Sequence, residues 1–184
     1  MGELVVVRHA DTDWSVSGQH TGHTDIPLND KGREAARRLP AQLAHWSFAA
    51  VLCSPLMRAK ATCEIAGYGD RAQLDAGLEE WDYGSYEGLT TAQIREQRPD
   101  WDLWRDGCPD GEDAAAVGAR ADSVLHELPG AGEVLAFSHG HFLRVLIARW
   151  LGLEPGDGAL FVLEPGGIGV LGHEHGRRVL RALG

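Results

Sequence analysis

The stretch LVVVRHADTDWS, residues 4–15, runs four apolar residues directly into an arginine and a histidine. Four such residues are enough for a short buried strand, and an ordinary surface turn after it would use Gly, Asn or Ser. Arg8 and His9 instead place a positive charge and an imidazole at the end of a core strand. This pair predicts a binding site for an anion.

The length and charge of the chain limit what kind of protein it is. Its 184 residues are enough for one domain with a sizeable core, and its composition, 43% hydrophobic and 24% charged, is that of an ordinary globular protein. The net charge of −10 argues against the basic face that nucleic acid or an anionic membrane surface requires. We therefore expect one domain over residues 1–184, with neither nucleic acid nor a membrane as a partner.

Cysteine usage and the N-terminal residues bear on the compartment. Cys53, Cys63 and Cys108 are an odd number of cysteines at wide spacings, unlike a disulfide framework. The first twenty residues carry several charges, and no run of about 18 apolar residues occurs, so neither a signal peptide nor a membrane-spanning helix is expected. These features predict a cytoplasmic protein.

Apolar runs alternate with helix-like segments along most of the chain. Strands are predicted at 3–7, 50–53, 133–137, 159–163 and 168–172, and helices at 29–44, 57–66, 113–128 and 141–151. Asn29 is a good N-cap for the first helix, and Pro40 predicts a bend or break within it. This alternation predicts an α/β fold, a three-layer sandwich whose central sheet is mostly parallel and has helices on both faces.

Residues 78–112 differ from the rest of the chain. They are rich in Trp, Gly, Asp and Pro and show no clear period. Long irregular segments of α/β proteins commonly carry or cover the functional site. We expect this segment to be an irregular insertion over the active site.

Three predicted strands end in a cationic or imidazole side chain. Arg8 and His9 follow the first strand, Arg58 lies in SPLMRA after the strand at 50–53, and His139 lies in SHGH after the strand at 133–137. Sites in such sheets form at the carboxyl ends of the strands, so these groups are expected to converge. Two guanidiniums and nearby helix N-termini suit phosphate oxygens. The pattern predicts a phosphate pocket.

These motifs together resemble the histidine phosphatase superfamily, the phosphoglycerate-mutase-like group whose catalytic histidine lies in an RHG motif. RHADTDWSVSGQHTGHTDIPLNDKG is similar to that family's RHGExxWN…GxxxGxxDxPLTxxG segment, and CSPLMRAKAT to its SPLxRAxxT helix. LEEWDYGSYEGLT is similar to LxExxxGxxEG, and SHGH to the second histidine motif. Four motifs in this order make a specific match. The length of the chain is like that of the small bacterial broad-specificity acid phosphatases of the group.

The resemblance implies a metal-independent phosphomonoesterase of the acid phosphatase type, without a cofactor, acting on small phosphorylated metabolites. His9 would be the nucleophile and form a phosphohistidine. Arg8, Arg58 and His139 would hold the phosphoryl oxygens and neutralise charge during the transfer. The implied substrate-binding residues are Arg8, Ser15, Gln19, His20, Thr21, Arg58, His139 and Gly140.

A carboxylic acid must protonate the leaving group and then activate water. Glu79 and Glu80 are adjacent, and their side chains point to opposite faces of an extended chain, so only one serves. The spacing to the following GSYEG matches Glu80 to the acid of the family. Three positions depart from the family pattern: Ala10 replaces Gly, Ser15 replaces Asn and Gln19 replaces Arg. The last change removes a positive charge and weakens the case for a bisphosphate-specific enzyme.

Other readings within this fold stay open. A phosphoglycerate mutase is the alternative, since it uses the same phosphohistidine but retains it until a second acceptor binds. A non-catalytic binder of phosphorylated ligands is opposed by the presence of both His9 and Glu80. Members of the group are often dimers, so a homodimer formed through the late apolar strands is possible on this resemblance.

Two further motifs belong to other classes of enzyme. GIGVLG at 167–172 fits the dinucleotide fingerprint, but only twelve residues follow it, too few for the required helix and strand. AFSHG at 136–140 is close to a nucleophile elbow, with Ser138, Asp157 and His173 as a formal triad. That reading leaves the arginines and the first histidine without a role.

The remaining histidines carry less information. His20 and His23 either line the mouth of the pocket or are solvated loop residues. His173 and His175 have the spacing of metal ligands on a strand face, but no third ligand lies in register, so a surface strand is favoured and no metal site is predicted.

Overall fold

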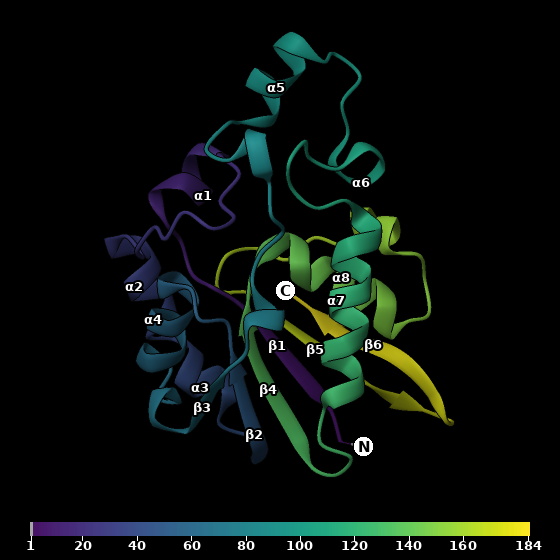
Figure 1. Cartoon of the computed structure of the whole chain (residues 1–184). Coiled ribbons are helices and arrows are strands. Elements are labelled where there is room, and N and C mark those ends of the chain that lie inside the picture. Colours follow the sequence, from purple (N-terminus) through teal and green to yellow (C-terminus); the bar gives the residue numbers. More distant parts are fainter. Residues whose placement is uncertain (1) are drawn as a thin grey trace.

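The computed structural model describes residues 2–184, and one six-stranded sheet forms its centre (Figure 1). The strands are β1 (Leu4–Arg8), β2 (Phe48–Cys53), β3 (Ala72–Leu74), β4 (Glu133–Ser138), β5 (Ile168–Glu174) and β6 (Arg177–Leu183). Their spatial order is β3-β2-β4-β1-β5-β6. The first four strands in this order run parallel, while β5 and β6 pair antiparallel. The predicted α/β fold with a mostly parallel sheet is confirmed.

Helices cover both faces of the sheet because side chains alternate along each strand. Val5 and Val7 of β1 pack with the residues of α2 (Asp30–Ala36), α3 (Leu39–Leu43) and α4 (Met57–Ile65). Leu4 and Val6 belong to the opposite core, with α7 (Ala114–Glu127) and α8 (Gly140–Trp150). Figure 1 shows these two helix groups on either side of the sheet. Within residues 2–184, no helix combines the length and apolarity needed to cross a membrane.

Three loops leave the carboxyl edge of the sheet at nearly the same level. In the parallel ladder Arg8 lies opposite Ser138, and the backbone N–H of His9 donates to the Ser138 carbonyl at 2.8 Å. The N–H of Ser54, just after β2, donates to the carbonyl of Phe137 at 2.9 Å. The residues that follow β1, β2 and β4 therefore begin side by side.

The helix predicted at 29–44 is two helices. Asn29 is its N-cap as predicted, with its side-chain oxygen accepting from the N–H of Gly32 at 2.8 Å. The break comes before Pro40, which lies in the first turn of α3, where a missing N–H costs no helical hydrogen bond. The predicted break at Pro40 is confirmed: α2 ends at Ala36, the residue whose carbonyl would have no donor, and would meet the proline ring, if the helix continued through Pro40.

The strand predicted at 159–163 is wrong. Residues Pro155–Leu160 form the 3-10 helix η4, and the chain that follows joins no ladder. The carbonyls of Gly158, Ala159 and Leu163 instead accept hydrogen bonds from arginine side chains. Two strands were missed: β3 has only three residues, and β6 reads RRVLRAL, a charged pattern typical of an edge strand.

The segment 78–112 is only partly irregular. It contains η3 (Gly84–Tyr86) and the short helices α5 (Thr91–Gln97) and α6 (Leu103–Asp106), while η2 (Ala76–Leu78) comes just before it. Thr90 and Gln93 form a capping box at the start of α5. With α1 (Asp13–Ser17), these helices lie beyond the carboxyl ends of the central strands (Figure 1).

Replacing Gly32 by Ala should destabilise the fold. A Cβ at residue 32 would overlap the backbone of Asp11, two residues after His9. We expect Gly32→Ala to lower the free energy of unfolding by roughly 1–3 kcal/mol, the usual cost of overpacking. Gly130→Ala is the matched control, because a Cβ there meets no atom within 4 Å. Urea denaturation measures both, and equal stabilities would contradict the predicted close contact.

Candidate active site

A cavity of about 240 Å³ lies at the carboxyl edge of the sheet. It is smaller than the range of about 300–1,000 Å³ common for pockets that bind drug-sized ligands, which indicates a small ligand. The lining residues are Arg8, His9, Ser15, Gly18, Gln19, His20, Thr21, Glu80, Tyr83, Thr91, Gly140, His141 and Arg144. Most of the predicted site residues are therefore brought together, but Arg58 and His139 are not part of this wall.

His9 is buried and holds a defined tautomer. Its Nδ1 lies 2.8 Å from the carbonyl oxygen of Ala10. Since a carbonyl only accepts, Nδ1 must carry the hydrogen, and Nε2 keeps its lone pair. Burial, followed by the charges of Arg58 and Arg8, lowers the pKa of His9 well below its ordinary value of 6.5. The ring is therefore neutral even at mildly acid pH, with the Nε2 lone pair free of a proton.

Arg8 lies beside His9 against the start of α8. Its Nη1 donates to the carbonyl of Leu163 at 2.7 Å, whereas its buried Nε has no hydrogen-bond partner among residues 2–184. Gly140 permits this placement, because a Cβ there would lie 3.0 Å from both Nε and Cζ of Arg8. A buried unpaired donor is costly, and an anion in the cavity would supply its acceptor.

Glu80 is held at the N-terminus of α8 by backbone donors. Its Oε1 accepts from the N–H of Phe142 at 2.8 Å and from that of Trp81 at 2.9 Å. Its Oε2 accepts from the N–H of His141 at 3.2 Å. The carboxyl group therefore lies on the wall of the cavity that holds His9 and Arg8, in one orientation.

Arg58 is fully buried and donates mainly to the chain between α1 and α2. Its two Nη atoms donate to the carbonyls of Thr21, Gly22 and Thr24 at 2.9–3.2 Å, and its Nε donates to Nδ1 of His139 at 3.1 Å. These contacts fix the loop that carries Thr21 into the cavity wall. The predicted direct contact between Arg58 and a phosphate stays a prediction.

His139 is also fully buried, and its ring lies close to that of His9. The two ring centroids are 5.2 Å apart. Because Nδ1 of His139 accepts from Arg58, its Nε2 carries the hydrogen and donates to Ser54 Oγ at 2.7 Å. Burial, together with the charge of Arg58, lowers the pKa of His139 well below 6.5. His139 is a neutral ring whose contact with substrate likewise stays a prediction.

Arg144 is the most informative residue that the sequence analysis missed. Its Nε and Nη2 donate to the carbonyls of Gly158 and Ala159, and its guanidinium lies 4.4 Å from the centre of the Trp104 ring. Burial, and next the charge of Arg8, lowers the pKa of Arg144. The cavity thus has a second positive group. Arg144 lies one helical turn after Gly140, and this spacing is a signal that could have found it.

Tyr83 and His141 form a buried pair on the same wall. The Tyr83 hydroxyl lies 2.6 Å from Nδ1 of His141. Burial raises the pKa of Tyr83 and lowers that of His141, so both are neutral and the hydroxyl donates to the ring.

His20 and Thr91 also line the cavity, and the sequence analysis did not name Thr91. The Thr91 hydroxyl oxygen lies 3.4 Å from Nε2 of His20. For His20 the sequence left open the mouth of the pocket or a solvated loop, and the buried His20 side chain lies in the pocket wall.

The other predicted motifs do not reach the cavity. The buried hydroxyl of Ser138 donates to the Leu78 carbonyl at 2.6 Å and not to an imidazole, which opposes a serine nucleophile. His23 has a side chain 62% exposed, near Glu79 and Asp82. GIGVLG lies largely in β5. Across residues 2–184, no three His, Cys, Asp or Glu side chains are grouped in a way that could hold a metal ion.

Comparison with known proteins decides the family. A family model described as histidine phosphatase superfamily (branch 1) matches residues 4–184. The chain belongs to this superfamily. An acid phosphatase from Mycobacterium tuberculosis is 44% identical over 186 residues, which cover 98% of this chain and 91% of that protein. A sedoheptulose 1,7-bisphosphatase from Saccharomyces cerevisiae is 31% identical, over 93% of this chain and 87% of that protein.

A solved structure agrees with this assignment. The product of the open reading frame Rv3214 from Mycobacterium tuberculosis superposes with a TM-score of 0.94 at 43% identity, covering 100% of this chain and 97% of that one. The predicted resemblance is confirmed, and the chain is a phosphatase of the histidine phosphatase superfamily. The mutase alternative is the less supported of the two.

The buried histidines of this phosphatase should make its stability depend on pH. Burial lowers the pKa of His20 to about 4. Between pH 6.5 and about 4 the unfolded chain binds a proton there that the folded chain excludes, so the free energy of unfolding falls as pH falls. One such histidine contributes a slope of up to about 1.4 kcal/mol per pH unit. We expect His20→Gln to flatten this slope in urea denaturation from pH 7 to pH 5.

His126 supplies the control for this measurement. It is an exposed histidine on α7, and His126→Gln should leave the slope unchanged. Parallel slopes for the wild type and His20→Gln would contradict the prediction that His20 is buried in the neutral form.

Proposed function

We propose that this phosphatase is a metal-independent acid phosphatase that hydrolyses small phosphorylated metabolites through a phosphohistidine on His9. The observation that carries the proposal is the tautomer of His9, whose Nδ1–H is engaged by Ala10 so that the Nε2 lone pair remains available. The unpaired Nε of Arg8 on the same cavity wall supports the binding of the phosphoryl group. The lowered pKa of His9 supports activity at acid pH.

The first half-reaction transfers the phosphoryl group to the enzyme. Nε2 of His9 attacks phosphorus, the bond from phosphorus to the ester oxygen breaks, and Glu80 gives its proton to the departing alkoxide. Arg8 compensates the charge on the transferring group, which is the main contribution a protein makes to phosphoryl transfer. Arg58 does not line the cavity, but its charge acts on His9 and adds to the same positive field.

The second half-reaction restores the enzyme. Glu80, now a carboxylate, takes a proton from a water molecule whose oxygen attacks phosphorus. The bond between phosphorus and Nε2 breaks, its electron pair returns to the ring, and inorganic phosphate leaves. Every proton is accounted for by Glu80, and neither step needs a metal.

The distribution of charge in the cavity supports a substrate with a second anionic group. The sequence analysis counted Gln19 against such a substrate, but Arg144 supplies a positive charge from α8 instead. The relative from Saccharomyces cerevisiae is by its name a bisphosphatase, which agrees with this assignment. We infer that Arg8 and His9 receive the phosphate that is hydrolysed and that Arg144 receives the other anionic group.

The same proposal includes the cellular compartment and the oligomeric state of the protein. We place the activity in the cytoplasm, supported by three cysteines that are all free and buried. We also propose a homodimer, supported by the exposed apolar side chains Leu160 and Val162 near the late strands.

Replacing His9 should abolish turnover. We expect His9→Ala to lower the hydrolysis of p-nitrophenyl phosphate at pH 5.5 in EDTA by about a thousandfold or more, because the nucleophile is lost. Labelled substrate should leave an acid-labile phosphate on the wild type and none on His9→Ala. His23→Ala, which changes an exposed histidine outside the cavity, should retain activity. EDTA-sensitive turnover, or an acid-stable phosphoenzyme, would contradict the mechanism.

Arg144 should act on substrate selection. We expect Arg144→Met to raise KM by about tenfold or more for monoesters that carry a second phosphate or carboxylate, the effect of one lost charged hydrogen bond. For p-nitrophenyl phosphate, which has no second anionic group, KM should change little. Steady-state kinetics on the two substrate classes measures the difference. An equal rise in both values of KM would argue against this role.

A further inference from the structure

Arg120 on α7 uses all five of its N–H donors within the described structure. Its Nη1 donates to the carbonyls of Gly77 and Glu79 at 3.0 and 2.6 Å. Its Nη2 donates to the carbonyl of Glu80 at 3.1 Å and to Oε2 of Glu112 at 2.8 Å, and its Nε donates to Oε1 of Glu112 at 3.1 Å. A guanidinium offers five N–H donors in one rigid plane, and each of the five donors of Arg120 has its own acceptor.

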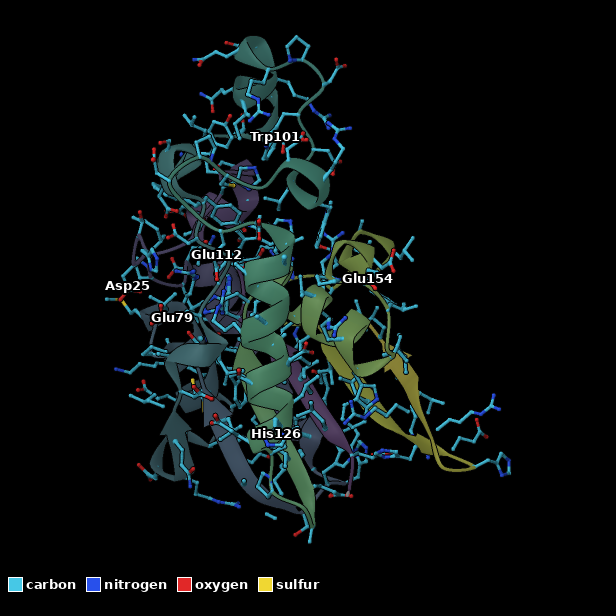
Figure 2. The ribbon with its side chains drawn as sticks, turned by 45° about the vertical axis from the view of Figure 1, so that its right-hand side comes forward. Asp25, Glu79, Trp101, Glu112, His126 and Glu154 are labelled. Atoms are coloured by element: carbon cyan, nitrogen blue, oxygen red, sulfur yellow. The ribbon has the colours of Figure 1, made fainter. Side chains whose placement is uncertain are left out.

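Glu112 extends this contact along the same segment. Its Oε2 accepts from the backbone N–H of Asp82 at 2.9 Å, and its own N–H donates to the Asp82 carbonyl at 2.9 Å. Its carbonyl accepts from Nε1 of Trp81 at 2.9 Å. Figure 2 shows Glu112 near the N-terminal end of α7, with Glu79 on the same side of that helix. Residues 77–82 are thus bonded to Arg120 of α7 and to Glu112, which lies just before α7.

Arg120 also contacts the residue that orients the Glu80 carboxyl group. Its Cζ lies 4.7 Å from the centre of the Phe142 ring, and the N–H of Phe142 donates to Oε1 of Glu80. One guanidinium therefore touches the main chain of Glu80 and a donor to its side chain. Arg120 and Glu112 do not line the cavity that holds His9, so they have no direct path to the substrate.

The N-terminus of α8 holds the carboxyl group of Glu80, but the backbone of Glu80 lies outside regular secondary structure. η2 ends at Leu78, and residues 79–83 belong to no helix or strand. A proton donor must stay within hydrogen-bond reach of the ester oxygen, and a displacement of about 1 Å can cost about a hundredfold in rate. Without Arg120, three carbonyls of this segment would lose their side-chain donor.

We propose that Arg120, together with Glu112, is a positioning residue for proton transfer by Glu80. The pair holds the carboxyl group where it protonates the leaving oxygen, without touching the substrate. This inference rests on the proposed role of Glu80 as the acid. Lysine cannot replace Arg120, because its three donors on one nitrogen cannot serve five acceptors spread over two segments.

The test compares leaving groups that differ in their need for a proton. p-Nitrophenolate leaves with little protonation, whereas an alkoxide such as that from glycerol 1-phosphate must be protonated. We expect Glu80→Gln to lower kcat/KM for glycerol 1-phosphate at least tenfold more than for p-nitrophenyl phosphate. Arg120→Met and Arg120→Lys should show the same selective loss, with kcat falling and KM nearly unchanged, and lysine should not restore the ratio.

Arg149 provides the matched control. It lies on α8 and pairs with Asp122 of α7 through two hydrogen bonds of 2.9 Å, but it does not contact residues 77–82. Arg149→Met should therefore leave the ratio of the two kcat/KM values at the wild-type level. If Arg120→Met does not fold, Glu112→Gln carries the same comparison, because it weakens the pairing with Arg120 at nearly unchanged volume.

The outcomes separate this inference from the proposed function. If Glu80→Gln is selective and the Arg120 and Glu112 variants lower both substrates equally, the two residues are only structural and the inference is overturned, while the role of Glu80 stands. If Glu80→Gln itself is not selective, the assignment of Glu80 as the acid is wrong and the inference fails with it. Selective loss in both sets of variants supports the inference.

Discussion

The parallel pairing of β1 with β4 brings the residues of the candidate active site together. Arg8 lies opposite Ser138 in the ladder, so the residues that follow the two strands leave the sheet at one level. His9 and His139 come from segments 130 residues apart and reach a centroid separation of 5.2 Å as a result. A slip of one residue would move the apolar side chains of a strand to the wrong face. The packing of the core thus sets the geometry of the site.

The arginines of the site are held in a way that preserves their charge. Arg8, Arg58 and Arg144 donate mainly to backbone carbonyls, which accept hydrogen bonds without neutralising the cation. Arg120, by contrast, is paired with the carboxylate of Glu112. In a chain of net charge −10, an anionic substrate would otherwise meet a repulsive field. The two arginines that line the cavity, Arg8 and Arg144, therefore keep an uncompensated charge there, whereas Arg120, outside the cavity, is paired with a carboxylate.

Much of the fold and the site could be predicted because continuous apolar runs mark buried strands and because Arg8, His9, Glu80 and Gly140 follow from motif order. The edge strand β6 could not, since its three arginines are exposed and leave no continuous apolar run. The segment at 159–163 has an apolar pattern, but its backbone carbonyls accept hydrogen bonds from arginine side chains and do not pair with another strand. These hydrogen bonds join residues far apart in the chain, so the hydrophobic periodicity of the segment itself cannot predict them.

Acid pH has opposite effects on the proposed catalysis and on the stability of the folded protein. Burial and the charges of Arg58 and Arg8 keep the pKa of His9 well below 6.5, so its ring stays neutral in mildly acid solution, as the proposed mechanism requires. The same burial lowers the pKa values of His20, His139 and His141, so their exclusion of protons costs stability below about pH 6.5. Under the proposed function, a phosphate ester offsets this loss when it binds, because a ligand at a hundred times its Kd stabilises the folded state by about 2.7 kcal/mol. Under the proposed function, the cluster of buried cations and imidazoles is therefore most stable when a phosphate ester occupies the cavity.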